Sequence, residues 1–592
     1  MSLLQSAKRE FIYISAVGRT MRRIRHFTPD STRTIVDIVQ DHARERPNNI
    51  ALIYQDRTVT YRALDEGANR YAHWALAQGV MRGDAVALLV ENRPEFVMAW
   101  LGILKIGGIA ALINTNLRGA PLAHSIGIAN TKHVIVGAEL AANLAEAAPQ
   151  IESQPAVWIT SETHDGNLDA ALAASSIAPP PADARAGVTC KDKAFYIYTS
   201  GTTGLPKAAN FTHLRMMFMM NGFSGGLNTT ERDRMYNALP LYHTAGGVCA
   251  LGAMLLVGGA CIIRRKFSVS EFWDDCYRYR ATCFQYIGEL CRYLLNAPPH
   301  PHERDHQIRV ITGNGLRAEI WPLFQQRFAI PKIIEFYGAT EGNVSMLNYD
   351  GTVGAIGRIP SYMRSLITTR LVRFDIEAEM PVRGPDGLCI ECENDEAGEA
   401  IGEITGEAGK TFDGYTKAQD TNKKILHDVF KKGDTWFRTG DLLRRDAHGY
   451  FYFVDRIGDT FRWKGENVST NEVAEALNVV PGVRDANVYG VAIPGHDGRA
   501  GMAALVAGPE FDLSALAQNL ARNLPAYAQP LFIRLQPEIE ITGTFKLRKV
   551  DLVQQGFDPR TIADPLYVLE HGVYVPLDAA RYDAIVSGQT KI

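Results

Sequence analysis

Cysteine and net charge are both scarce in this chain. Eight cysteines are spread over 592 residues, and 62 Lys and Arg nearly balance 65 Asp and Glu, which leaves a formal net charge of -3. So few thiols favour a reducing compartment over a disulfide framework. The balanced charge argues against nucleic acid as a partner. A chain of this length is too long for one core, so we expect two or more domains.

Metal-binding and membrane-spanning patterns are scarce as well. Cys389 and Cys392 form a C-x-x-C pair, but no second cysteine pair or histidine pair lies at zinc spacing, so we assign them no metal or redox role. Residues 245–263 carry no charge over nineteen positions, which is just long enough to cross a bilayer. Five glycines interrupt this segment, so we predict a buried helix, a turn at Gly258 and Gly259, and a strand.

The N-terminal segment is basic and amphipathic. Its apolar residues recur at helical spacing: Leu4, Ala7, Phe11, Ile14, Met21 and Ile24. Its charged residues are one acid, Glu10, and the cations Lys8, Arg9, Arg19, Arg22, Arg23 and Arg25. Such a helix can lie on an anionic membrane surface, and it can equally pack on its own domain. The order of charges is not that of a secretory signal, but a transit peptide is also Arg-rich and poor in acids.

Short apolar runs alternate with helical patterns along most of the chain. The runs lie at residues 86–90, 133–136, 194–198, 309–311 and 332–334. This alternation predicts an α/β fold, with a large N-terminal domain of mostly parallel sheets flanked by helices. Near the C-terminus, a strand at 487–491 and a helix at 513–524 predict a separate, small α+β domain. We therefore divide the chain into a basic segment (1–26), a large domain (27–457) and a small domain (458–592).

The most informative local pattern is the loop YTSGTTGLPK at residues 198–207. A predicted strand leads into small hydroxyl residues and glycines, and a helix is predicted to begin near His213. Backbone N–H groups in such a loop can approach a polyphosphate closely, and its hydroxyls can donate to phosphate oxygens. The pattern differs from the G-x-x-x-x-G-K-[ST] P-loop, and composition alone is as typical of a surface turn.

This decapeptide resembles the signature loop of the adenylate-forming enzymes, which include acyl-CoA synthetases, firefly-type luciferases and the adenylation domains of peptide synthetases. Further motifs of that superfamily follow in its order: LPLYH at 239–243, GNG at 313–315, YGATE at 337–341, RTGD at 438–441, DR at 455–456 and TGTFK at 542–546. YGATEGN at 337–343 and DRIGDTFRWKGENVS at 455–469 are similar to the fatty acid transport protein and very-long-chain acyl-CoA synthetase group. That group has Phe545-Lys546 where other branches have Gly-Lys.

The resemblance implies an AMP-binding adenylation domain over residues 27–457. The residues implied to hold the ATP phosphates are Thr199, Ser200, Gly201, Thr202, Thr203, Gly204 and Lys207. Those implied to frame adenine are Gly313, Asn314, Gly315, Tyr337 and Gly338. Asp441 would accept hydrogen bonds from the ribose hydroxyls, and Arg456 would support the ribose or a phosphate. Thr340 would contact the α-phosphate, and Glu341 would bind Mg²⁺, a hard cation that prefers oxygen ligands.

Two further residues are implied to act on the acid. Lys546 matches a lysine that enters the site on the small domain and bridges the carboxylate and the α-phosphate. The physical reason is that two anions must approach each other, and a cation between them offsets their repulsion in the transition state. His243 matches a residue that lines the acyl entrance, so we interpret it as a gate and not as a general base.

One active site must then serve two unlike reactions, adenylate formation and transfer to a thiol. The family solves this by rotating the small domain about a hinge that follows the Asp-Arg motif. The hinge position here is Gly458, where many relatives have Lys or Asp, and glycine tolerates the change in dihedral angles. After rotation, the loop around Gly465 would line the path of the coenzyme A pantetheine.

From the sequence we predict a long- or very-long-chain fatty acid–CoA ligase that uses ATP, Mg²⁺ and coenzyme A. One alternative is an enzyme that uses the same first step with another acid, such as a bile acid, or with another acceptor, such as a carrier-protein thiol. Another is a fatty acid transport or lipid-binding protein with secondary ligase activity; uptake and ligation can also coexist, because esterification traps the acid. We expect a cytoplasmic protein, with peripheral contact at the inner face of a membrane left open. Chain length and oligomeric state do not follow from the sequence.

Overall fold

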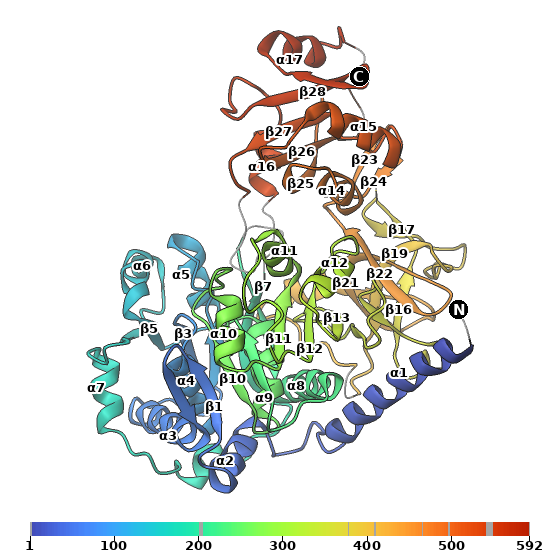
Figure 1. Ribbon diagram of the computed structural model, residues 1–592. Helices are drawn as coiled ribbons and strands as arrows, with labels where there is room; N and C mark the ends of the chain where they lie inside the picture. Colours follow the sequence, from blue (N-terminus) through green and yellow to red (C-terminus); the bar gives the residue numbers. More distant parts are fainter. Residues whose placement is uncertain are drawn as a thin grey trace. The chain divides into compact units, whose positions relative to one another are not determined.

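The computed structural model describes residues 3–199, 205–376, 378–407, 410–464, 466–494, 496, 498–539 and 549–590 (Figure 1). The chain divides into two compact units. The first contains Met1–Leu316, Ile320–Arg358 and Glu403–Ile425, and the second contains Arg317–Glu319, Ile359–Gly402 and Leu426–Ile592. The domain boundary between residues 457 and 458 stays a prediction.

The first unit contains an eight-stranded sheet with the strand order β14-β13-β12-β11-β9-β10-β1-β2. All its inner pairs are parallel, and only the outer pairs β1–β2 and β13–β14 are antiparallel. The strands are β1 (Ile50–Tyr54), β2 (Arg57–Thr60), β9 (Arg234–Asn237), β10 (Ala260–Ile263), β11 (Cys283–Ile287), β12 (Val310–Asn314), β13 (Ile333–Gly338) and β14 (Ser345–Asn348).

The first unit also contains a six-stranded sheet with the strand order β6-β5-β3-β4-β7-β8. Its pairs are parallel except for β7–β8. The strands are β3 (Ala85–Leu89), β4 (Ile109–Leu112), β5 (His133–Gly137), β6 (Ala156–Thr160), β7 (Lys193–Thr199) and β8 (Lys207–Thr212). The predicted α/β fold with mostly parallel sheets is therefore confirmed.

The first unit also contains helices, several of which pack on these sheets. They are α1 (Leu3–Ile24), α2 (Ile35–Glu45), α3 (Tyr61–Ala77), α4 (Pro94–Lys105), α5 (Gly119–Ile128), α6 (Ala141–Ala147), α7 (Asn167–Ala174), α8 (His213–Leu227), α9 (Leu251–Leu255), α10 (Phe272–Arg278), α11 (Gly288–Asn296), α12 (Trp321–Arg327) and α13 (Ala418–Asn422). Helix α3 is capped by Thr60, whose side chain accepts from the N–H of Ala63. Helix α4 begins at Pro94, where the missing N–H costs nothing.

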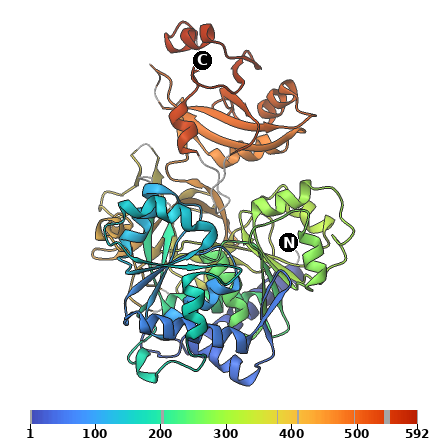
Figure 2. The same ribbon diagram turned by 90° about the vertical axis from the view of Figure 1, so that its left-hand side faces the viewer.

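The second unit is built on antiparallel and mixed sheets. Strands β16 (Thr369–Val372), β19 (Ala397–Glu403), β21 (Thr435–Arg445) and β22 (Tyr450–Arg456) lie side by side in one sheet. A five-stranded sheet has the order β25-β26-β27-β28-β29 and is drawn in orange and red in Figure 1, with a second view in Figure 2. Its strands are β25 (Val483–Val491), β26 (Ala500–Ala507), β27 (Phe532–Gln536), β28 (Leu566–Glu570) and β29 (Val573–Pro576). The smaller elements are β17 (Phe374–Asp375), β18 (Met380–Pro381), β23 (Phe461–Trp463), β24 (Glu466–Val468), α14 (Thr470–Asn478), α15 (Leu513–Asn523), α16 (Val550–Gln555) and α17 (Ala579–Val586).

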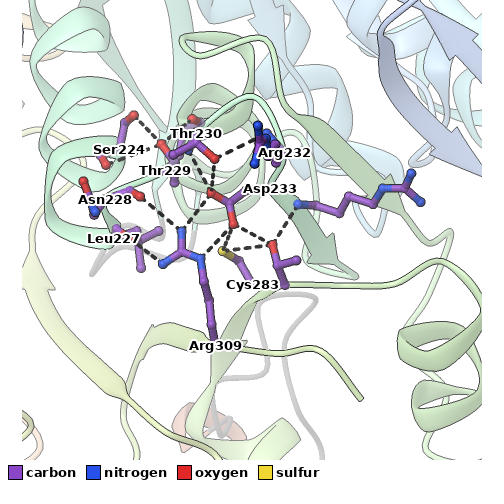
Figure 3. A network of polar contacts seen from close by, with 12 residues as sticks. Ser224, Leu227, Asn228, Thr229, Thr230, Arg232, Asp233, Cys283 and Arg309 are labelled. Atoms are coloured by element: carbon purple, nitrogen blue, oxygen red, sulfur yellow. Dashed lines mark hydrogen bonds and ion pairs between the residues drawn. The ribbon is translucent and has the colours of Figure 1, made fainter. Parts of the chain in front are cut away.

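A polar network fixes the C-terminal end of α8 (Figure 3). Arg309 donates to the carbonyl oxygens of Leu227 at 3.0 Å and Asn228 at 3.2 Å, which terminate the helix. Its guanidinium also pairs with both carboxylate oxygens of Asp233, at 2.8 and 2.9 Å. Because the last carbonyls of a helix have no partner within the helix, this arginine satisfies groups that would otherwise be left unpaired.

The N-terminal helix α1 packs on α8 with one face and exposes the other. Tyr13 is buried against Tyr349, with ring centroids 5.7 Å apart. Near the end of α1, Arg23 donates to the Thr229 carbonyl at 3.0 Å. The apolar positions singled out in the sequence lie mostly on the opposite face. The exposed fractions there are 83% for Leu4, 72% for Phe11, 58% for Ile14 and 54% for Met21.

Residues 245–263 form no membrane span. Thr244–Ala250 is a π-helix, α9 follows, and β10 ends the segment inside the eight-stranded sheet. Nearly all of these side chains are buried, so the predicted buried helix, turn and strand are confirmed. Among the residues that the structure describes, no helix is both long enough and apolar enough to cross a bilayer.

Candidate active site

The predicted nucleotide motifs of the first unit follow the carboxyl ends of parallel strands. Gly313 and Asn314 end β12, and Tyr337 and Gly338 end the neighbouring β13. In open α/β sheets, ligands bind outside this edge because loops and helix N-termini converge there. The Gly313 backbone is packed so closely that an added Cβ would lie 2.3 Å from the Tyr286 carbonyl oxygen. Asn314 and Gly338 are exposed, which leaves backbone accessible at the edge.

Thr340 lies in a loop that is held through its backbone. The half-buried Arg215 donates from Nε to the Thr340 carbonyl at 2.8 Å and from Nη2 to the Ala339 carbonyl at 2.8 Å. Nη2 also donates to the Gly342 carbonyl. The Thr340 hydroxyl lies 3.1 Å from the hydroxyl of Thr244. One guanidinium therefore fixes three backbone carbonyls within residues 339–342, and it does so from α8, more than a hundred residues earlier in the chain.

The Glu341 carboxylate is oriented by a phenol. Tyr415 donates from its hydroxyl to Glu341 Oε1 at 2.8 Å. Burial, and then the adjacent Glu341 charge, raise the pKa of Tyr415 well above its ordinary value, so the phenol keeps its proton and acts as the donor. Sequence reasoning did not identify Tyr415 or Arg215, because neither lies in a motif that was singled out.

Lys207 forms an ion pair beside the same tyrosine. Its Nζ lies 2.9 Å from Asp420 Oδ1, and the side chains are 15% and 17% exposed. The ammonium also lies 5.7 Å from the centroid of the Tyr415 ring, within cation–π range. Thr199 ends β7 at the start of the predicted phosphate loop. The remaining loop residues, Ser200, Gly201, Thr202, Thr203 and Gly204, lie outside the described residues.

A buried carboxyl group supports the predicted adenine loop. Glu335 Oε1 accepts a hydrogen bond of 3.0 Å from the Leu316 N–H, and Oε2 accepts one from the Tyr286 hydroxyl. Gly315, which precedes Leu316, has a φ of 81°, a conformation that favours glycine. Burial raises the pKa of Glu335 to about 8. This residue was missed too, although a charged residue inside the apolar strand β13 is a usable signal.

His243 precedes the π-helix, and its carbonyl accepts from the Gly247 N–H at 2.8 Å. Gly246 and Gly247 are required there, since added Cβ atoms would lie 2.5 Å from the Pro240 carbonyl oxygen and 2.0 Å from that of Leu241. The π-helix is rare and is frequently found at functional sites. The predicted gating role of His243 stays a prediction.

Asp441 and Arg456 face each other in the second unit. They are register partners on β21 and β22, and Arg456 Nε lies 3.7 Å from Asp441 Oδ1. Gly440, just before Asp441, has a φ of 82°. Asp455 is buried and accepts from the Thr470 N–H at 2.6 Å, which secures the start of α14. Their predicted contacts with the ribose stay predictions.

The predicted hinge residue Gly458 has a φ of 94°, and an added Cβ would meet nothing within 4 Å. An L-residue here would therefore be strained by its backbone and not by a clash. Gly465 and Lys546, the remaining predicted site residues, lie outside the described residues.

The metal-coordinating side chains of this site suit a metal ion only when a nucleotide supplies further oxygen ligands. Within the described part of the chain, no group of three His, Cys, Asp or Glu side chains could hold a metal ion. Mg²⁺ is commonly held by one or two carboxylates together with substrate phosphates, and Glu341 supplies one oriented carboxylate. The residues therefore fit an ion that arrives on a nucleotide. All eight cysteines are free and buried, and burial raises the pKa of Cys392 to about 12.

These features agree with the comparisons to known proteins. The family model described as AMP-binding enzyme matches residues 39–392, and the one described as AMP-binding enzyme C-terminal domain matches residues 472–546. Long-chain fatty acid transport protein 1 of Mus musculus is 42% identical over 596 residues, which cover 99% of this chain and 92% of that protein. Long-chain fatty acid transport protein 2 of Rattus norvegicus is 41% identical over 604 residues, which cover 100% and 96%.

The chain thus belongs to the AMP-binding enzymes and, within them, to the long-chain fatty acid transport protein family. Solved structures share the fold. ATP-bound MatB from Rhodopseudomonas palustris has a TM-score of 0.73 at 24% identity, covering 88% of this chain and 98% of that one. The anthranilate CoA ligase AuaEII in complex with anthranoyl-AMP has a TM-score of 0.75 at 21% identity, covering 89% and 98%.

Proposed function

We propose that this protein is an ATP-dependent ligase that converts a long- or very-long-chain fatty acid into its coenzyme A thioester. The observation that carries the proposal is the arrangement around Glu341. Its carboxylate and the Thr340 hydroxyl belong to one motif of the family, and the Lys207 ammonium belongs to a second. Contacts through Arg215 and Tyr415 order these groups in the first unit.

ATP is needed because a carboxylate is a poor acyl donor. In the first step, a carboxylate oxygen bonds to the α-phosphorus of ATP, the bond to the bridging oxygen breaks, and pyrophosphate leaves. In the second step, the coenzyme A thiol loses its proton, its sulfur bonds to the acyl carbon, and AMP leaves. The first step brings two anions together, so cationic and hydrogen-bonding groups at the α-phosphate lower its barrier.

The residues divide this work between them. Thr340 donates to the α-phosphate, and Lys207 offsets charge on the outer phosphates. Glu341 would hold a magnesium ion, which supplies positive charge to the phosphates when it is bound. Lys546 bridges the carboxylate and the α-phosphate, an assignment that rests on its place in the terminal TGTFK motif.

Further residues bind the rest of the nucleotide and the second substrate. Asp441 and Arg456 bind the ribose, and the 313–315 loop together with Tyr337 frames adenine. In the thioester-forming step, Gly458 is the pivot and the loop at Gly465 lines the pantetheine path.

The acid is proposed from the relatives, which are named as long-chain fatty acid transport proteins. A panel of acids from acetate to very-long-chain fatty acids, with a bile acid included, tests it by following AMP and acyl-CoA formation. We expect equal amounts of AMP and thioester, and the highest kcat/KM for chains of long or very long length. Absence of AMP with every acid, or a preference for short or aromatic acids, would contradict the proposal.

The names of the relatives also favour a second role, the uptake of fatty acids, which ligation would drive by trapping the acid. Contact with the inner face of a membrane is part of this proposal. The exposed apolar stripe of α1 (Leu4, Phe11, Ile14 and Met21) supports it, because exposed cations accompany the stripe on the same helix. Esterification without uptake in cells that express the protein would leave ligation as the sole role.

A further inference from the structure

The chain returns to the candidate site in the segment 413–416, far in sequence from the nucleotide motifs. This segment runs along β8. The Asn210 N–H donates to the Gly414 carbonyl at 2.9 Å, and the Thr416 N–H donates to the Ala208 carbonyl at 3.0 Å. Tyr415 itself pairs with Ala209 in an antiparallel bridge. The backbone of Tyr415 is therefore fixed to the sheet strand that leaves the predicted phosphate loop.

The Tyr415 side chain is fixed as well, and its hydroxyl is the atom it presents to the site. The residue is only 6% exposed, and its ring faces the Lys207 ammonium at 5.7 Å. Its hydroxyl reaches Glu341 Oε1 at 2.8 Å. Two neighbouring acids extend this pattern. Asp413, in the same segment, accepts from the hydroxyl of Thr212, the residue that caps α8. Asp420, in α13 just after the segment, pairs with Lys207.

We propose that Tyr415 is a positioning residue that sets the direction of the Glu341 carboxylate toward the metal-bound nucleotide. A carboxylate on an extended side chain rotates freely, and a donor that holds one oxygen fixes the direction in which the other points. Such a donor favours metal binding because the carboxylate is already ordered before the metal arrives, so binding no longer carries that entropic cost. The inference rests on the proposed function, because it assigns Glu341 to the metal.

The experiment measures ATP binding without any acid. Isothermal titration gives the Kd for ATP with magnesium and with EDTA, and the ratio of the two reports the metal-dependent part of binding. We expect Tyr415→Phe, which removes only the hydroxyl, to reduce this ratio about tenfold while leaving the Kd in EDTA nearly unchanged.

Tyr54→Phe is the matched control. Tyr54 is also buried and donates to a glutamate, Glu162 Oε1, at the same 2.8 Å, but it lies in β1, away from the nucleotide motifs. It should keep the wild-type ratio. In Glu341→Gln the Kd for ATP should be the same with magnesium and with EDTA. Adding Tyr415→Phe to this variant should change nothing more, because the two residues act through one carboxylate.

A wild-type ratio in Tyr415→Phe, an equal loss in Tyr54→Phe, or an additive effect in the double variant would overturn the proposal. Wild-type protein that binds ATP equally with magnesium and EDTA would overturn it too. A normal metal-dependent ratio together with failure of the acid panel would instead overturn the proposed function alone.

Discussion

The Arg215 guanidinium and the Thr340 carbonyl oxygen are joined by a hydrogen bond of 2.8 Å inside the first unit. Arg215→Lys keeps the charge but loses the planar fork that reaches three carbonyls. We expect the loop to loosen and ATP–pyrophosphate exchange to fall at least about tenfold per folded molecule, because a small displacement of Thr340 costs transition-state stabilisation. The measurement is the rate of ATP–pyrophosphate exchange divided by the concentration of folded protein.

Arg309→Lys is a control for the general effect of losing a guanidinium that donates to several backbone carbonyls. Arg309 also donates to carbonyls of the chain around α8, those of Leu227 and Asn228, but at the opposite end of the helix. It should lower the melting temperature with little change in exchange rate per folded molecule. Equal losses of exchange in both variants would mean that Arg215 acts through general stability.

Glu335 predicts a pH dependence of stability. Its pKa in the folded protein is about 8, above the ordinary value near 4.5, so the folded state favours the protonated form. Its stabilising contribution is complete below pH 4.5 and is lost as pH rises to 8. The Gln side chain of Glu335→Gln stays neutral at every pH. The unfolding free energy of the variant minus that of the wild type should therefore increase by on the order of 2–4 kcal/mol between pH 5 and pH 8.

Urea denaturation of both proteins across this range measures the difference. Parallel stability curves would show that Glu335 ionises normally. The comparison uses Gln because it preserves an acceptor for the Leu316 N–H and a group of similar volume at the Tyr286 hydroxyl.

Local patterns were sufficient to predict most of the framework. The strand predicted at 133–136 is β5 (His133–Gly137), and the helix predicted at 513–524 is α15 (Leu513–Asn523). Both depend on runs of apolar residues, which are visible in a single segment. The strand predicted at 332–334 extends to Gly338 because the motif residues themselves continue β13.

The supporting contacts of the site could not be predicted in the same way. Arg215 and Thr340 are separated by 125 positions, and Tyr415 and Glu341 by 74. Nothing local marks Tyr415 as a donor to a carboxylate, since its partner is chosen by the pairing of segment 413–416 with β8. Motif resemblance identifies the groups that face a substrate, whereas the groups behind them depend on tertiary contacts.

The exposed stripe of α1 predicts membrane binding that can be separated from folding. Leu4→Ser with Phe11→Ser changes two of the most exposed apolar side chains of the helix. We expect partitioning onto vesicles of phosphatidylcholine and phosphatidylserine to fall at least about tenfold, since two apolar side chains no longer enter the interface. Met81→Ser, at a 67% exposed position outside α1, should bind vesicles like the wild type. Unchanged cosedimentation of the double variant would leave packing on α8 as the role of the helix.

Lys546→Ala tests the catalytic assignment. We expect adenylate formation to fall by orders of magnitude, because the repulsion between carboxylate and α-phosphate is no longer offset. Conversion of supplied acyl-adenylate to thioester should persist, since that step does not join two anions. A loss of less than about tenfold in pyrophosphate exchange, roughly 1.4 kcal/mol, would show that another residue supplies the charge.

Gly458→Pro tests whether the chain pivots between two poses. The φ of Gly458 is 94°, whereas proline fixes φ near -65° and also restricts Ile457 before it. The variant therefore cannot adopt the backbone conformation seen at residue 458. A half-reaction that requires this conformation should be lost, while the other half-reaction persists. We expect the ratio of pyrophosphate exchange to thioester formation from supplied adenylate to change at least about tenfold.

Gly572→Pro is the control. It removes a φ of 82° at another glycine of the second unit with open space around it, and it should lower both rates equally or leave both unchanged. If the two half-reactions also changed in parallel in Gly458→Pro, the pivot would not lie at this residue, because a hinge used differently in two poses cannot lose one of its conformations without separating them.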